Sequence, residues 1–381
     1  MTVHVLLVSQ QPLPNIIPLL DPGLHARRAV LVVSHGMSER ARWMESVLTG
    51  YGIRCDTWPI ADAWDFESVQ MRMMELADRE SSAVASKALW LNATGGTKLM
   101  SMAAHSVFRS YELPVYYIHP ERGALLWLFP EGRPAQALAD RLRIEWLLQA
   151  HGAQVQGVLQ RNVPDRKPLM LAERLVADVE RYSSAIGAVN ALAAQARPPD
   201  FEVEMSHTDA ILEELIGLFS EYGVLERCST TGIRFAGEAN RFLANGGWLE
   251  MYVFDQCRQL RRIDPRIQDL AWGVKVQRRQ RNRWVPNELD VVILRDNRLH
   301  VIECKTRRFF GGQHGSVGAE ALYRLDTLRD LMGGLHARAM LASFRDLPPH
   351  DRARAADLRI EVCAGSQLRR LNESLLNFIR C

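Results

Sequence analysis

The sequence lacks the features that would assign it to three classes of protein. Its 381 residues include six cysteines, and no two of them form a CxxC pair, which argues against a zinc cage and a disulfide framework. No stretch approaches the ~20 apolar residues that a membrane-spanning helix needs. The opening MTVHVLLVSQQPLP has a short apolar core and no basic region before it, unlike a signal peptide. We therefore expect a cytoplasmic protein without a membrane segment.

A strong charge of one sign is also missing. The formal net charge is +3, and 24% of the residues are charged. Such a mild balance does not by itself indicate a nucleic-acid partner, so only local clustering of charge can do so. The length allows two or three domains, and we find neither an internal repeat nor a low-complexity tract.

The pattern along the chain predicts an α/β protein with two main domains. In residues 1–140, short apolar runs alternate with longer helical segments, which is typical of a Rossmann-like domain with a mostly parallel sheet. Residues 141–200 have the Ala/Leu-rich texture of a helical linker that ends at ARPPD. Residues 201–245 suggest a winged-helix-like connector. Residues 246–381 predict a second α/β domain with a mixed sheet, in which Asp296-Asn297 is the turn between two neighbouring strands.

The stretch NATGGTK, residues 92–98, follows an apolar strand and precedes a helix that should begin near Gly96 or Thr97. The first N–H groups of such a helix form a site that favours anions. The spacing fits neither the Walker A motif nor GxGxxG, so neither nucleotide triphosphate hydrolysis nor NAD binding follows. The alternative is a tight strand-to-helix turn with no ligand.

Two further polar loops follow the first two predicted strands. Ligands of doubly wound sheets bind beyond the carboxyl ends of the strands, so the three loops should converge. Their mostly uncharged donors, with a single lysine, suit a ligand that has ribose, base and phosphate groups. The candidate ligand-binding residues are Ser9, Gln10, Gln11, Ser34, His35, Gly36, Met37, Thr94, Gly95, Gly96, Thr97 and Lys98.

A second constellation lies in residues 246–381. Strand alternation in HVIECKTRR places Glu303 and Lys305 on one face, and Asp290 lies on the preceding predicted strand, thirteen residues earlier. Burying an unpaired acid or lysine is costly, so this pattern needs a reason. One interpretation is an ion pair of these residues on a solvated strand edge. The functional reading is that Asp290, Glu303 and the backbone carbonyl of Cys304 bind Mn²⁺ or Mg²⁺, while Lys305 positions water or neutralises charge.

Basic residues cluster beside this constellation. Between Arg258 and Arg283 there are nine basic residues against two acidic ones, with Trp272 and Trp284 nearby. Basic and aromatic side chains together suit a single-stranded nucleic acid, although a solvated hairpin tip is the alternative. The predicted nucleic-acid-binding residues are Arg278, Arg279, Arg281, Arg283, Arg307 and Arg308. The glycine-rich loop at 311–318 is interpreted as a loop that controls access to the site. His314 in this loop is not expected to be a catalytic base.

Residues 1–140, through NATGGTK, resemble the CARF domain, the sensor module of type III CRISPR ancillary effectors. The D…ExK arrangement resembles the PD-(D/E)xK nucleases with their restriction-endonuclease-like fold, although Pro286 does not immediately precede Asp290. The resemblance implies that Glu250, on the preceding helix, is a further catalytic or metal-binding acid. Glu288, two residues before Asp290 on the same predicted strand face, is a second candidate. It also implies that Tyr323 and Arg324 orient the substrate.

The whole chain resembles CARF–PD-(D/E)xK effectors. This resemblance implies a homodimer in which a cyclic oligoadenylate, expected to be cyclic tetra-adenylate, allosterically activates a metal-dependent nuclease in antiviral defence. Single-stranded DNA, RNA or supercoiled DNA would be the substrate. Two alternatives stay open: a ligand-responsive nucleic-acid-binding regulator with an inactive nuclease fold, and a restriction or repair nuclease that senses another nucleotide.

Overall fold

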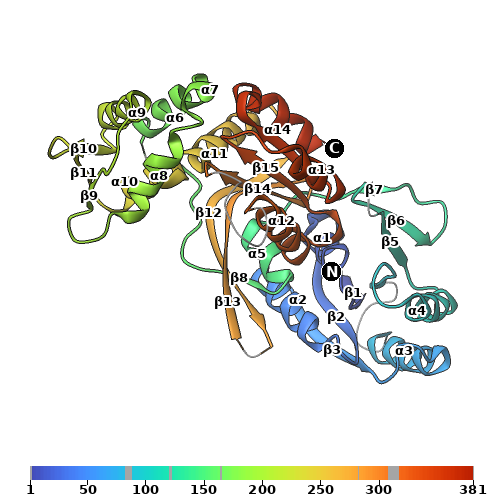
Figure 1. The fold of residues 1–381 in the computed structure, drawn as a ribbon. Coiled ribbons are helices and arrows are strands. Elements are labelled where there is room, and N and C mark those ends of the chain that lie inside the picture. Colours follow the sequence, from blue (N-terminus) through green and yellow to red (C-terminus); the bar gives the residue numbers. More distant parts are fainter. Residues whose placement is uncertain are drawn as a thin grey trace.

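The computed structural model describes residues 2–81, 88–119, 122–163, 165–281, 283–307 and 317–380. Figure 1 shows two α/β parts packed together, with a smaller connector projecting from the second part, on the side away from α3 and α4. Within the described residues, no helix combines the length and apolar composition that crossing a bilayer requires.

The N-terminal part is built on a seven-stranded sheet with the order β3-β2-β1-β4-β5-β6-β7. The first five of these strands pair in parallel, and β6 and β7 add antiparallel strands at one edge. This topology confirms the Rossmann-like prediction. The strands are β1 (Thr2–Leu7), β2 (Ala26–Ser34), β3 (Arg54–Ile60), β4 (Leu89–Asn92), β5 (Val115–His119), β6 (Ala124–Phe129) and β7 (Gln136–Ala137). The helices are α1 (Leu13–Leu20), α2 (Ser38–Gly50), α3 (Phe66–Ser81) and α4 (Lys98–Ser110), with the 3-10 turn η1 (Pro22–Leu24).

The C-terminal part contains a mixed six-stranded sheet with the order β16-β15-β14-β13-β12-β8. Asp296 and Asn297 have φ of 50° and 56°, which makes the tight turn that joins β13 to β14 as predicted. The strands are β8 (Ala153–Val155), β12 (Ile267–Gln280), β13 (Arg283–Arg295), β14 (Arg298–Lys305), β15 (Arg338–Ser343) and β16 (Ile360–Ala364). The helices are α11 (Trp248–Arg261), α12 (Val317–Gly333), α13 (Pro349–Asp357) and α14 (Leu371–Arg380), with the 3-10 turns η3 (Gly334–His336) and η4 (Gly365–Arg370).

The connector combines short helices with a small sheet. Its three antiparallel strands have the order β10-β11-β9. Its elements are α6 (Lys167–Ala177), α7 (Val179–Tyr182), α8 (Ile186–Gln195), β9 (Glu202–Glu204), α9 (Ala210–Glu221), β10 (Leu225–Arg227), β11 (Gly232–Phe235), α10 (Glu238–Phe242) and the π-turn η2 (Leu243–Gly247). The helix and hairpin expected here are present, and a winged helix stays a prediction.

The segment predicted to be a helical linker holds the two main parts together. It begins with α5 (Ile144–Ala150), whose Leu147 and Leu148 are fully buried. They belong to a hydrophobic cluster that includes Leu6 and Leu31 from the first sheet and Leu341 from the second. The segment then supplies β8, which pairs with β12 at the edge of the second sheet. The two main parts therefore share one core.

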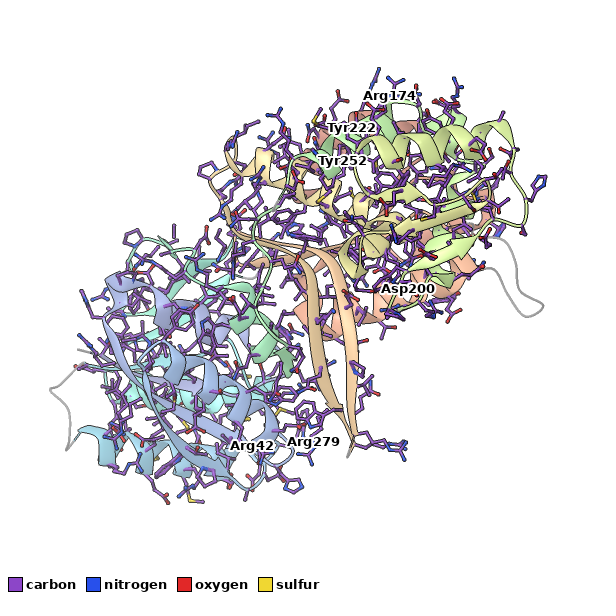
Figure 2. All side chains as sticks on the ribbon, turned by 90° about the vertical axis from the view of Figure 1, so that its left-hand side faces the viewer. Arg42, Arg174, Asp200, Tyr222, Tyr252 and Arg279 are labelled. Carbon is purple, nitrogen blue, oxygen red and sulfur yellow. The ribbon has the colours of Figure 1, made fainter. Side chains whose placement is uncertain are left out.

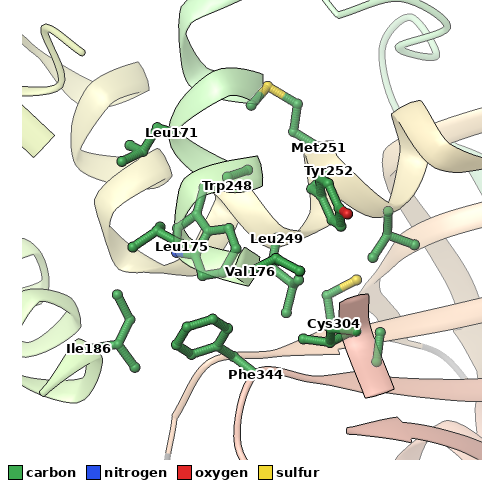
Figure 3. Packing of buried hydrophobic residues seen from close by; sticks show 14 of the residues in the cluster. Leu171, Leu175, Val176, Ile186, Trp248, Leu249, Met251, Tyr252, Cys304 and Phe344 are labelled. Carbon is green, nitrogen blue, oxygen red and sulfur yellow. The ribbon is translucent and has the colours of Figure 1, made fainter. Parts of the chain in front are cut away.

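Helix α11 is held in a second cluster between the connector and the second sheet. Figure 3 shows Trp248 and Leu249 at its start, facing Leu175 of α6, Ile186 of α8 and Phe344. The Trp248 and Phe344 rings meet edge to face, with centroids 5.1 Å apart. Burial of side chains of this size stabilises the fold by about 1.5–3 kcal/mol each. The start of α11 therefore packs against Phe344, whose N–H donates to Lys305 O at the end of β14 at 2.8 Å.

His300 on β14 gives a testable dependence of stability on pH. It is 2% exposed, its ring lies 5.3 Å from that of Phe378, and burial followed by nearby arginines lowers its pKa to about 3. The unfolded chain takes up this proton near pH 6.5 and the folded chain does not, so the stability contribution is lost as pH falls below 6.5. We expect His300→Leu to gain about 1.4 kcal/mol per pH unit relative to wild type between pH 6.5 and 4.5.

Urea unfolding at several pH values measures this difference. Comparing the two proteins cancels the titration of all the other groups that they share. His350→Leu, at an exposed histidine of α13, is the control for replacing a histidine by leucine elsewhere in the same part of the protein. A difference in unfolding free energy between His300→Leu and wild type that stays constant with pH would contradict the assignment.

Candidate functional sites

A cavity of about 470 Å³ lies at the carboxyl ends of β1, β2 and β3 and at the start of α4. Seven of the predicted ligand-binding residues line it: Ser9, Gln10, Ser34, His35, Met37, Gly96 and Thr97. The convergence follows from the topology, because the carboxyl ends of parallel neighbouring strands meet at one edge. The walls carry neutral donors and acceptors, and Asp62 is the one acidic side chain among the described residues that line the cavity.

Buried amides hold the NATGGTK loop in place. The Asn92 side chain donates to Pro14 O at 2.9 Å and to Asn15 Oδ1 at 3.0 Å, and Asn15 donates to Leu7 O at 2.8 Å. A Cβ on Gly95 would lie 1.9 Å from Leu7 O, so only glycine fits against the end of β1. Together these contacts fix the loop against β1 and α1.

The loop ends in a capped helix. Thr97 is the N-cap of α4, because its Oγ1 accepts from Met100 N at 3.1 Å, and it donates to Ala63 O at 2.9 Å. The helix therefore starts where the sequence predicts. The bond to Ala63 also ties the loop to the segment after β3.

The other predicted ligand residues lie outside the cavity. The Thr94 hydroxyl is occupied, since it donates to Asn92 Oδ1 at 2.6 Å and accepts from Ile118 N at 2.8 Å. Lys98 is exposed at the start of α4, and Gly36 occupies an exposed bend with φ of 82°. Gln11 points elsewhere: a Cβ on Gly334, just after α12, would lie 2.5 Å from Gln11 Oε1. Gly95 is packed against β1 as described above.

Sequence reasoning missed one wall of this cavity. Ala61, Asp62, Ala63 and Trp64 follow β3 and line it, and Trp64 is 72% exposed. Strand β3 ends at the same edge of the sheet as β1 and β2. The rule that ligands bind beyond the carboxyl ends of the strands therefore also applies to the loop after β3. A large exposed aromatic surface in a concave site indicates a stacking partner.

The second site lies where β13 and β14 run side by side. Val291 pairs with Ile302 across these antiparallel strands, so Asp290 and Glu303 occupy the next opposite positions. Both line a cavity of about 360 Å³ together with Lys305, Glu250 and Glu288. The predicted D…ExK residues and the helix acid are therefore brought together. Lys305 Nζ lies 2.5 Å from Glu303 Oε1.

A glycine allows α11 to bring Glu250 to these strands. Gly246 precedes the helix with φ of 114°, and a Cβ there would lie 2.5 Å from Thr306 Oγ1. Glu250 Oε2 is buried, and it has no hydrogen-bond partner among the described residues. An ionisable oxygen left in this state indicates a missing positive partner.

The electrostatics of the cavity also indicate a missing positive partner. Burial first, and then the charge of Glu303, raise the pKa of Asp290, and burial with the charge of Asp290 raises that of Glu250. Burial opposes the charge on Lys305, yet Glu303 and Asp290 outweigh it and raise its pKa. Four acids therefore lie close together in one partly buried cavity: Glu250, Glu288, Asp290 and Glu303. A bound cation would reduce the repulsion between them.

The donor set fits a hard cation in an open site. Asp290 Oδ2 accepts from Cys304 N at 2.7 Å, which fixes the carboxylate. In the part of the chain that the structure describes, no cluster of three or more His, Cys, Asp or Glu side chains forms a metal cage. Two carboxylates and one carbonyl, completed by water and substrate, are an arrangement that Mg²⁺ accepts. The Cys304 thiol faces away, into the apolar cluster under α11 (Figure 3).

The predicted basic residues separate into two groups. Arg307 lines the β13–β14 cavity, joined there by Arg324 of α12, while Tyr323 lies under the guanidinium of Arg354 instead. The rest of the group lies on the β12–β13 hairpin, and Arg283 is roughly 23 Å along the strand from Asp290 at ~3.3 Å per residue. Arg308, His314 and most of the 311–318 loop lie outside the described residues.

The β12–β13 hairpin forms an arm that runs out from the second sheet, with Arg279 near its end (Figure 2). Arg278 packs inward: its Nη2 donates to His151 O at 3.0 Å, and burial with the charge of Arg40 lowers its pKa. Arg279, Arg281 and Arg283 are exposed, and Trp284 beside them is 49% exposed. The tip therefore offers basic and aromatic surface, but it is not a wall of the cavity.

The fold and the two cavities define a class of protein: a sensor domain of Rossmann type joined to an endonuclease domain. Residues 3–145 match the family described as "Card1 CARF domain", and residues 236–381 match "Card1-like, endonuclease domain". The chain belongs to this Card1 family of CARF-domain nucleases, which are effectors of type III CRISPR systems. No curated protein matches the chain significantly.

Solved structures share the fold of this chain. Protein VC1899 from Vibrio cholerae is 30% identical with a TM-score of 0.89, over 100% of this chain and 98% of that one. Can2 from Sulfobacillus thermosulfidooxidans, in complex with cyclic tetra-adenylate, is 24% identical with a TM-score of 0.83, over the whole of both chains. A type III CRISPR defence DNA nuclease activated by cyclic oligoadenylate is 18% identical with a TM-score of 0.58, over 91% of this chain and 46% of that one.

Proposed function

We propose that this chain is a homodimeric, metal-dependent endonuclease that cyclic tetra-adenylate activates. It would cut single-stranded DNA, RNA or supercoiled DNA in the cytoplasm as part of antiviral defence. The observation that carries the proposal is the convergence of Asp290, Glu303 and Lys305, with Glu250, in one cavity. Membership of the Card1 family supports it.

The cavity at the ends of β1–β3 suits the activator. Neutral donors such as Ser9 and Ser34 match ribose and base groups, and the capped start of α4 favours phosphate. Trp64 offers a face for stacking on adenine. Can2, which shares the fold, has been seen with cyclic tetra-adenylate.

Exposed methionines on two adjacent helices support the dimer. Met71 and Met74 on α3 and Met102 on the adjacent α4 are 61%, 45% and 62% exposed. Monomeric proteins rarely expose a cluster of large apolar side chains. These methionines lie on the two helices that follow residues 61–64 and 96–97 in the walls of the activator cavity, so pairing through them would place two cavities near one twofold axis.

In the nuclease cavity, Asp290, Glu303 and the Cys304 carbonyl would hold Mg²⁺ or Mn²⁺, with Glu250 as a further oxygen donor. When bound, the cation supplies a positive charge for the phosphate and lowers the pKa of a water. Lys305 holds the attacking water or stabilises the negative charge that develops on the phosphate. Glu303 keeps the ammonium in place through their contact. Arg307 and Arg324 bind neighbouring phosphates at the cavity rim.

Helix α12 is our proposed link between the two cavities. Ser9, a wall of the activator cavity, donates to Gln11 O at 3.1 Å. The Gln11 side chain packs against Gly334, directly after α12, and Ala321 and Arg324 on the same helix line the nuclease cavity. The helix spans roughly 25 Å at ~1.5 Å per residue. A shift of the Ser9 loop on activator binding would move α12, and Arg324 with it.

Gln11→Ala tests this link. We expect the dissociation constant of cyclic tetra-adenylate to stay within about twofold, while the activated cleavage rate falls by roughly 5- to 150-fold, the range of typical allosteric coupling. Gln10→Ala, at the neighbouring cavity residue, should instead weaken activator binding. Isothermal titration and cleavage assays measure the two effects. Full activation of Gln11→Ala would contradict the route through α12.

A panel experiment tests the proposed function. The purified protein is mixed with cyclic oligoadenylates of several ring sizes, Mn²⁺ or Mg²⁺, and labelled single- and double-stranded DNA and RNA. We expect cleavage only when both the metal and cyclic tetra-adenylate are present. Equal cleavage with and without activator would favour a nuclease that senses another nucleotide. Binding of nucleic acid without cleavage would favour a regulator with an inactive nuclease fold.

A further inference from the structure

A groove of about 510 Å³ adjoins the nuclease cavity on the side of the connector. Its lining residues are Ser184, Gly187, Ala188, Asn190, Ala191, Ala194 and Arg307. Arg307 also lines the nuclease cavity, so the groove and the cavity meet at this side chain. The volume lies in the ~300–1,000 Å³ range of small-ligand sites.

The groove exists because one face of α8 carries only small side chains. The opposite face is filled by Ile186, Val189 and Leu192, which pack into the cluster around α11. A leucine at Ala188 or Ala191 would occupy the open space instead. A ligand chain with a bulky backbone can therefore approach the axis of α8 closely in this groove.

A buried amide at the floor of the groove indicates a ligand. Asn190 is 2% exposed, and its Nδ2 donates to Thr306 Oγ1 at 2.8 Å. Its Oδ1 is buried with no hydrogen-bond partner among the described residues. Native proteins seldom leave a buried acceptor in this state, so a donor on a ligand in the groove is the natural partner. Thr306 directly follows Lys305, which ties this amide to the nuclease site.

The charge of the groove favours a phosphate chain. Among the described residues that line it, none has an acidic side chain. Arg307 stands at the junction, where its Nη2 donates to Asn245 Oδ1 at 2.9 Å. Arg345 Nη1 lies 3.8 Å from the position of a Cβ on Gly187. The guanidinium groups of Arg307 and Arg345 thus lie beside a groove whose described lining residues carry no negative charge.

We propose that the α8 groove holds the nucleotide of the substrate strand next to the phosphate that is cut. Its phosphate binds Arg307, and its sugar and base lie along α8, with a hydroxyl or amino group donating toward Asn190. This inference rests on the proposed nuclease function and adds a substrate subsite to it. The groove is then a determinant of substrate affinity that acts apart from the cutting residues.

Ala191→Leu tests the subsite by filling it. With cyclic tetra-adenylate, Mn²⁺ and a labelled single-stranded oligonucleotide, we expect KM to rise at least about tenfold while kcat stays within about twofold. Ala177→Leu, at an exposed alanine at the end of α6, is the matched control and should keep the wild-type KM. Activator affinity and the melting temperature should be unchanged in both variants.

An unchanged KM in Ala191→Leu would overturn the subsite, provided that the wild-type protein cuts the oligonucleotide. If Ala191→Leu melts at a lower temperature, Ala188→Leu at the exposed rim of the same groove replaces it and must show the same rise in KM. Failure of the wild-type protein to cut any nucleic acid would instead contradict the proposed function, which separates the two failures.

Discussion

Glu303→Gln is expected to lower the activated cleavage rate by roughly 10³-fold or more, because it removes the charge that would hold the metal and pairs with Lys305. The change keeps the size of the side chain, so the buried strands should not be disturbed. Affinity for cyclic tetra-adenylate should stay at the wild-type value, since the activator cavity lies in the other domain. Lys305→Met should reduce cleavage in the same way.

Glu361→Gln is the matched control for this prediction. Glu361 lies on β16, two strands from Glu303, and is exposed. It should cleave like the wild type. Cleavage is followed by gel electrophoresis of labelled oligonucleotides across Mn²⁺ concentrations. Metal-dependent cleavage by Glu303→Gln at the wild-type rate would remove Glu303 from the site.

Trp64→Ala is expected to weaken the binding of cyclic tetra-adenylate by roughly 5- to 150-fold, the loss that removal of one base–aromatic stack of ~1–3 kcal/mol produces. More activator would then be needed for half-maximal cleavage, while the rate at saturation is kept. Trp64→Phe should retain most of the affinity, because a smaller ring can still stack.

Trp284→Ala provides the comparison for Trp64, since both tryptophans are exposed but Trp284 lies on the arm. It should leave activator affinity unchanged. Isothermal titration with the activator alone measures both variants without a substrate. Equal activator affinity of Trp64→Ala and wild type would mean that the exposed ring serves another purpose.

The parts of the fold that the sequence predicted best are those with local periodicity. Alternation in HVIECKTRR placed Glu303 and Lys305 on one face, and the structure brings both into one cavity with Asp290. The polar ends of β1 and β2 were found because a sheet rule connects strand ends that are distant in sequence. These signals need no knowledge of how whole domains pack.

The missed features depend on contacts between distant segments. Nothing local in AQV at β8 indicates that it completes a sheet more than a hundred residues away. Thr94 and Gln11 have side chains suited to binding a ligand. In the structure, however, the Thr94 hydroxyl accepts from Ile118 N and the Gln11 amide lies against Gly334. Trp64 lies in the segment ADAW, which has no glycine and a single polar residue, so nothing local in it indicates a ligand site. The arginines of the arm are close to Asp290 in sequence, but the long β12–β13 hairpin places them far from it in space.

The way α5 and β8 join the two sheets limits how this protein can be cut into pieces. The match to the CARF family ends at residue 145, inside α5. A fragment truncated there would lose Leu147 and Leu148 and expose the apolar surfaces that they cover. Exchange of sensor domains between relatives would have to carry residues through Val155 to keep the second sheet complete. Because the sensor and the nuclease parts share one hydrophobic cluster in this chain, we expect neither part to fold stably alone.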